Sequence, residues 1–127
     1  MKYLIDSWAW VEYFNGTSAG VQVKNFLEED EIYTTILNIA EVISLAKRRN
    51  QNHEAIYTAM AQRSKMIDIL PETSKNAGLI HAEMRGKKSG FGMIDAFMLA
   101  VAKKMNAKII TGDEHFKGIK EAILITK

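Results

Sequence analysis

Five short segments rich in apolar, β-branched or aromatic residues divide this sequence of 127 residues, and stretches with helical spacing of apolar residues separate the first four segments. Short apolar runs without strict alternation are typical of strands that are covered on both faces of a sheet. Strands that alternate with helices indicate parallel pairing through right-handed crossovers. The pattern therefore predicts a three-layer α/β/α sandwich with a central parallel sheet. The predicted strands are residues 2–6, 31–35, 66–70, 107–113 and 122–126.

The stretches between these strands predict six helices, over residues 8–14, 18–29, 36–49, 53–65, 72–86 and 93–105. The helices 36–49 and 93–105 are apolar on most sides, so we expect both to be largely buried. The segment RGKKSGFG, residues 85–92, holds three glycines and predicts a turn before the last long helix.

Composition limits the class of protein. Hydrophobic residues make up 47% of the chain and charged residues 25%, as in ordinary globular domains, and we expect a single domain over residues 1–127. Cysteine is absent, which excludes a disulfide framework, thiolate zinc sites and cysteine nucleophiles. The first apolar run carries a charge and is a poor signal peptide, and no uncharged apolar stretch reaches the roughly 20 residues of a membrane span. We expect a cytoplasmic protein.

The net charge of +2 does not by itself indicate a nucleic-acid partner. Basic residues do cluster at 47–49, at 63–65 and at 85–88. Such clusters either neutralise phosphates or form solvated helix ends, where lysine and arginine are favoured. Charge alone leaves both interpretations open. Candidates for substrate contact in the last cluster are Arg85, Lys87 and Lys88.

Four acids are candidates for a site: Asp6, Glu41, Asp95 and Asp113. Asp6 closes the first predicted strand, Asp113 follows the fourth, and Asp95 lies in the first turn of a helix. Ligands of open α/β sheets bind beyond the carboxyl ends of the strands. These three positions therefore predict side chains that meet at one edge of the sheet.

Each acid also has an ordinary structural explanation. Asp6 could cap the helix that follows, Asp95 could be a first-turn acid, and Asp113 could be a turn residue. Glu41 is harder to explain, because it lies inside a helix that we expect to be buried, and burial of an unpaired carboxylate is costly. Asn38, one turn earlier, extends a narrow polar stripe on that helix. A buried ion pair is the alternative for Glu41.

Grouped in one cleft, the acids indicate a particular chemistry. Each close pair of carboxylates repels by about 4 kcal/mol at an effective dielectric of about 20, so protons or cations must neutralise the group. Oxygen ligands without histidine or cysteine favour Mg²⁺ or Mn²⁺ over zinc. A metal held in this way activates water for phosphoryl displacement. No P-loop or nucleophile elbow is present, so metal-assisted hydrolysis is the chemistry that the sequence best supports.

Four segments resemble the PIN-domain nucleases, and in particular the VapC-like toxins of VapBC toxin–antitoxin modules. They are YLIDSWAWVEYF (3–14), NIAEVI (38–43), GMIDAFMLAVA (92–102) and IITGDEHF (109–116). The motifs stand in the family's order, and the likeness covers about residues 2–125. The approach to the third motif, KKSGFGMID, is richer in glycine than is usual.

The resemblance implies a flavodoxin-like sheet and a ribonuclease that cleaves single-stranded or structured RNA. The four acids would bind one or two Mg²⁺ or Mn²⁺ ions, and Thr111 and Ser7 would support Asp113 or a metal-bound water. The family commonly forms homodimers. In toxin modules a VapB-like antitoxin segment covers the acidic groove.

Other polar and aromatic residues receive weaker assignments. His115, next to Asp113, is a candidate for contact with a substrate phosphate, whereas Asp68 and Glu114 are expected to lie outside the metal site. An aromatic group could stack on bases, but a partly buried helix or a dimer contact is favoured. This group is Trp8, Trp10, Tyr13 and Phe14.

Three alternatives to a toxin remain. One is a PIN nuclease of RNA maturation or decay without an antitoxin, and another is a metal-binding PIN domain with little turnover. The third is a phosphoacceptor signalling domain, which needs adjacent acids after the first strand. Here Asp6 is followed by Ser7 and Trp8, which disfavours this class.

Overall fold

A computed structural model describes residues 1–126, so Lys127, the last residue of the predicted domain, lies outside the described residues. Five strands in this range form a sheet in the order β3-β2-β1-β4-β5. Every adjacent pair is parallel, as predicted. The strands are Lys2–Ile5 (β1), Glu31–Thr35 (β2), Lys65–Ile67 (β3), Ala107–Thr111 (β4) and Ala122–Leu124 (β5).

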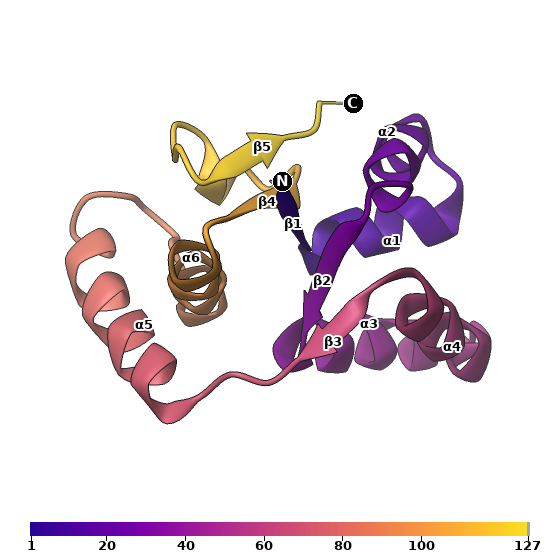
Figure 1. The fold of residues 1–127 in the computed structure, drawn as a ribbon, viewed down its shortest axis with the longest axis horizontal. Helices are drawn as coiled ribbons and strands as arrows, with labels where there is room; N and C mark the ends of the chain where they lie inside the picture. The colour runs from indigo at the N-terminus through magenta and orange to yellow at the C-terminus, as the bar shows by residue number, and fades with distance from the viewer. Residues whose placement is uncertain (127) are drawn as a thin grey trace.

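The helices cover both faces of this sheet. One layer contains α1 to α4 and the other contains α5 and α6 (Figure 1). The three-layer α/β/α sandwich predicted from the sequence is therefore confirmed. The helices are Ser7–Asn15 (α1), Ser18–Leu27 (α2), Ile36–Arg48 (α3), His53–Arg63 (α4), Pro71–Met84 (α5) and Met93–Met105 (α6), and a short 3₁₀ helix, η1, spans Glu114–Phe116. Among residues 1–126, no helix has the length and apolar character needed to cross a bilayer.

The neighbouring strands β1 and β4 contribute side chains to the cores beneath both helix layers. Ile5 and Ile110 belong to the core beneath α1 and α2, whereas Leu4 and Ile109 belong to the core beneath α6, and all four are fully buried. Burial on both faces explains why these strands read as continuous apolar runs. Each such side chain stabilises the fold by about 1.5–3 kcal/mol relative to exposure.

Several predicted element bounds differ from the structure by a few residues, and one short element was missed. The third strand was expected over 66–70 but spans Lys65–Ile67, and α4 ends at Arg63. Pro71 occupies the first turn of α5, where its missing N–H costs nothing. The turn η1 was not predicted, because three residues are too few for a periodic pattern.

Helix α3 is less buried than predicted. Its buried residues are Asn38, Val42 and Ala46, while Ile36 is 43% exposed. The helix packs against α1 and α4 at the side of the sheet that carries β2 and β3, so it covers the sheet with one narrow face. The helix α6, in contrast, has six buried residues and is largely buried, as predicted.

Candidate active site

Asp6 lies directly after β1, at the carboxyl end of the sheet. The parallel register pairs Ile5 with Ile110, so the next residues along β1 and β4 also meet. The hydroxyl of Thr111 donates a hydrogen bond of 2.7 Å to Oδ2 of Asp6. Asp6 precedes α1, yet its side chain makes no capping hydrogen bond. The ordinary explanation of this acid as a helix cap is therefore wrong.

A negative charge on Asp6 is unfavourable, because only 7% of this residue is exposed to solvent. Burial raises the pKa of Asp6 from the ordinary value of 3.8 to about 7. Hydrogen bonds from Thr111 and from the Ser7 backbone oppose this rise, and the charges of Glu41 and Asp113 add to it. Without a cation nearby, this carboxyl is therefore divided between its neutral and ionised forms near neutral pH.

Glu41 is exposed, so the prediction of a buried carboxylate at this position is wrong. The reason is the position of α3 at the end of the sheet, where Glu41 reaches the surface although Asn38, one turn earlier on the same helix, is buried. The hydroxyl of Ser7 donates a hydrogen bond of 2.6 Å to Oε1 of Glu41. Asn38 in turn donates to the Ser7 hydroxyl at 3.0 Å, and Thr35 donates to Oδ1 of Asn38 at 2.8 Å. Glu41 is thus held by a chain of polar groups rather than by an ion pair.

Asn38 was missed as a member of the site. It is fully buried, and its side chain connects the end of β2 with Ser7. The available signal was an amide in an apolar helix, one turn before a glutamate. A sequence does not show, however, that this amide lies between two hydroxyl groups.

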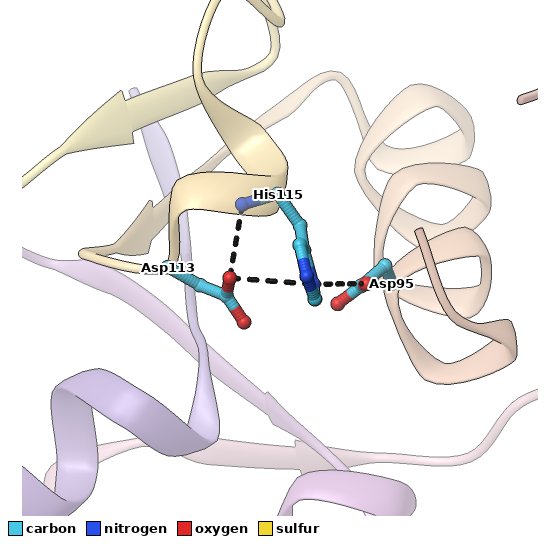
Figure 2. A group of neighbouring side chains, drawn as sticks. All are labelled: Asp95, Asp113 and His115. Carbon is cyan, nitrogen blue, oxygen red and sulfur yellow. Dashed lines mark hydrogen bonds and ion pairs between the residues drawn. The ribbon is translucent and has the colours of Figure 1, made fainter. Parts of the chain in front are cut away.

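Asp95 and Asp113 lie on either side of an imidazole. Figure 2 shows the His115 ring between the two carboxyl groups. Its Nδ1 lies 2.9 Å from Oδ2 of Asp95 and 3.4 Å from Oδ1 of Asp113. Asp95 also accepts a hydrogen bond of 2.8 Å from the Gly92 backbone, and Asp113 accepts one of 2.9 Å from the His115 backbone. Asp95 is therefore also a first-turn acid and Asp113 also a turn residue, which are the structural roles that the sequence suggested for them as alternatives.

Thr111 connects the two parts of the site. Its Oγ1 donates to Asp6 and accepts a hydrogen bond of 3.0 Å from the backbone N–H of Asp113. Asp6 also lies within electrostatic range of Glu41. The four acids, from the ends of β1 and β4 and from α3 and α6, therefore gather at the carboxyl end of the sheet.

A sequence model described as the PIN domain matches residues 3–122. The chain belongs to the PIN domain family. The comparison with curated proteins by sequence gave no significant match.

Solved structures share the fold of this PIN domain. A toxin–antitoxin complex from Klebsiella pneumoniae is 19% identical, with 99% of each chain covered and a TM-score of 0.84. VapBC-1 from nontypeable Haemophilus influenzae is 20% identical, with 100% of each chain covered and a TM-score of 0.73. Mycobacterium tuberculosis VapC20, a sarcin-ricin loop cleaving toxin, is 16% identical, with 84% of this chain and 85% of that chain covered and a TM-score of 0.65.

The ligand atoms of this PIN domain suit a divalent cation. Glu41, Asp95 and Asp113 each accept the hydrogen bonds described above through one carboxylate oxygen. The second oxygen of each acid has no hydrogen-bond partner within residues 1–126. Three residues, Asp95, Asp113 and His115, each offer one ligand atom, and these three atoms lie within 4.8 Å of one another. Oxygen-rich sites of this kind favour Mg²⁺ and Mn²⁺.

The remaining candidates lie away from this cluster or already have partners. Lys87 pairs with Glu83 at 2.9 Å on the surface of the PIN domain, Lys88 donates to a backbone carbonyl at 2.7 Å, and Arg85 is exposed. Asp68 is exposed and follows β3 rather than lying on it.

The aromatic residues of α1 are mainly structural. Trp10 is fully buried and donates to the Thr34 hydroxyl at 3.0 Å, and Tyr13 and Phe14 pack against it. The Trp8 ring lies against Gly112, where a Cβ atom would come within 2.3 Å of it. The favoured expectation of a partly buried helix agrees with these contacts.

Proposed function

We propose that this chain is a single PIN domain with divalent-metal-dependent endoribonuclease activity. The observation that carries the proposal is the meeting of four acids from four elements at the carboxyl end of the sheet. Thr111 holds Asp6 and the Asp113 backbone, Ser7 holds Glu41, and the His115 ring lies between Asp113 and Asp95. A fold gains nothing from holding a carboxyl such as Asp6 in a buried, mutually repelling group. A bound cation removes that cost.

The four acids would hold Mg²⁺ or Mn²⁺, which when bound neutralises phosphate charge and lowers the pKa of water. The chain itself supplies orientation. Thr111 holds Asp6 and the Asp113 backbone, Ser7 holds Glu41, and the Gly92 backbone holds Asp95, so the acids are oriented before substrate arrives. The raised pKa of Asp6, about 7, belongs to the chain without a cation, and a bound cation would keep this carboxyl ionised as a ligand.

We also propose that the protein is the toxin of a type II toxin–antitoxin system, with RNA as substrate, a VapB-like antitoxin as partner and a homodimer as assembly. Structures of toxin–antitoxin complexes match this chain over nearly its full length, which supports the proposal. A short neighbouring gene for a DNA-binding antitoxin would separate a toxin from a nuclease of RNA maturation or decay.

The deciding experiment incubates purified protein with labelled single-stranded RNA and total bacterial RNA in Mg²⁺, Mn²⁺ or EDTA. We expect cleavage with metal, none in EDTA, and loss of cleavage in Asp6→Asn and Asp95→Asn. Asp68→Asn, which changes an exposed acid outside the cluster, is the matched control and should stay active. Full activity of both site variants, or cleavage in excess EDTA, contradicts the proposal.

The toxin assignment has its own test, which is induced expression in a bacterial host. We expect growth arrest with the wild-type chain and normal growth with Asp6→Asn. Harmless expression of a protein that cleaves RNA in vitro would leave the nuclease standing and contradict the toxin.

A further inference from the structure

His115 faces the acidic cluster with a nitrogen atom. Its Nδ1 lies 2.9 Å from Asp95 and 3.4 Å from Asp113, and the three ligand atoms form one compact group (Figure 2). Ligand atoms placed about 2.1 Å from an octahedral cation lie about 3 Å from their neighbours. The separations of Nδ1 from the two carboxylate oxygens, 2.9 and 3.4 Å, are close to that spacing, and the ligand atoms of all three residues lie within 4.8 Å of one another.

The surroundings of His115 fix the ring in this position. The loop lies against the ring at Gly90, where an added Cβ would come to a tight 3.0 Å from Nε2, and the backbone φ of +76° at this position also favours glycine. Lys88 donates a hydrogen bond to a carbonyl just after η1, and the rings of Phe91 and Phe116 meet edge to face. The glycine-rich loop before α6, unusual for the family pattern, is thus fitted against the turn that carries the imidazole.

We propose that His115 is a direct ligand of the divalent cation, beside Asp95 and Asp113. The inference rests on the proposed metal-dependent function and adds a nitrogen to an otherwise all-oxygen site. Mg²⁺ is held by oxygen ligands, whereas imidazole suits transition ions. The consequence is a preference for Mn²⁺ and other first-row transition ions over Mg²⁺, set by His115.

The test is pulsed electron paramagnetic resonance of Mn²⁺ bound to tag-free protein, which detects ¹⁴N bound to the metal without any need for activity. The chain has three histidines, and two variants show which of them binds the metal. The double variant His53→Ala/His81→Ala keeps only His115 and should retain the nitrogen modulation. His115→Asn should lose it, and labelling with [¹⁵N]histidine should change it in the wild type.

Affinity gives a second measurement. Mn²⁺ binding to His115→Asn should weaken about tenfold or more, while Mg²⁺ binding, measured by competition, should change less than about threefold. His115→Gln, with a longer side chain that also lacks the imidazole, should behave in the same way. Because the His115 side chain is 39% exposed, both variants should fold.

The outcomes separate this inference from the function on which it rests. Mn²⁺ bound without nitrogen modulation overturns ligation by His115 and leaves the carboxylate nuclease intact. Nitrogen modulation in a protein that cleaves no RNA with any metal supports ligation and contradicts the nuclease. A protein that binds no Mn²⁺ contradicts both.

Discussion

The hydroxyl of Thr111 donates a hydrogen bond of 2.7 Å to Asp6, which is 105 positions away in the sequence, and its oxygen accepts a hydrogen bond from the backbone N–H of Asp113. One buried side chain therefore fixes two of the four acids. The arrangement follows from the adjacency of β1 and β4, whose ends carry these residues.

Replacing Thr111 by valine keeps the volume and removes the hydroxyl. We expect a loss of about 1–3 kcal/mol in the free energy of unfolding, because a buried carboxyl and a backbone N–H each lose a partner. RNA cleavage should also fall. Thr111→Ser keeps the hydroxyl and is the control in urea unfolding and cleavage assays. Equal stability and activity of the two variants would exclude this role for the hydroxyl.

The pKa of Asp6 predicts how stability depends on pH in EDTA. Because the folded value of about 7 is above the ordinary 3.8, the folded protein holds a proton that the unfolded chain releases. This contribution is fully present below 3.8 and is lost as the pH rises through about 7. The Tm of the wild type should therefore fall between pH 5 and pH 8 by more than that of Asp6→Asn, whereas Asp68→Asn should behave like the wild type. Parallel pH curves for all three proteins would show that Asp6 titrates normally.

Gly112 lies where a larger residue would meet Trp8. A Cβ there would come within 2.3 Å of the ring, so we expect Gly112→Ala to cost about 1–3 kcal/mol of stability and to displace Asp113. Gly78→Ala in α5 is the matched control, since nothing lies within 4 Å of the added atom. That control should gain about 0.5–1 kcal/mol. Thermal unfolding and Mn²⁺ titration measure both effects, and a Gly112→Ala protein with wild-type values would refute the close contact.

Replacing Glu41 and replacing Asp6 should have different effects on the free energy of unfolding. Glu41 is exposed, so Glu41→Gln should change the free energy of unfolding by less than about 0.5 kcal/mol while abolishing metal-dependent cleavage. Asp6→Asn in EDTA should instead stabilise the protein at pH 8, because the buried charge is gone. Chemical unfolding of both variants, beside the cleavage assay, checks the contrast. A large loss of stability in Glu41→Gln would mean that the Ser7 hydrogen bond supports the fold.

The sheet could be predicted from sequence because strands buried on both faces must be apolar throughout, as with Leu4 and Ile5. The burial or exposure of an individual acid could not be predicted in this way. Glu41 was expected inside the protein because its helix is apolar, yet α3 lies where one of its faces meets solvent. Asp6 resembled a helix cap, and only the pairing of β1 with β4 encloses it. These are tertiary properties that local patterns do not contain.

The contact between His115 and Asp95 was beyond prediction for a similar reason. The residues are 20 positions apart, on η1 and on α6, and they meet only because the loop at Gly90 lies against the ring. The sequence shows only that His115 is two positions after Asp113. Its position between two carboxyl groups depends on the packing of two turns.

The order of the strands has a consequence for the way in which the protein is made. β1 is translated well before β4, which is one of its two neighbours in the sheet. Until then β1 lacks a partner along one edge, and the nascent chain lacks Asp95 and Asp113. The proposed nuclease activity therefore cannot arise before β4 has been made and paired with β1, and until then the messenger and the ribosome are protected from it.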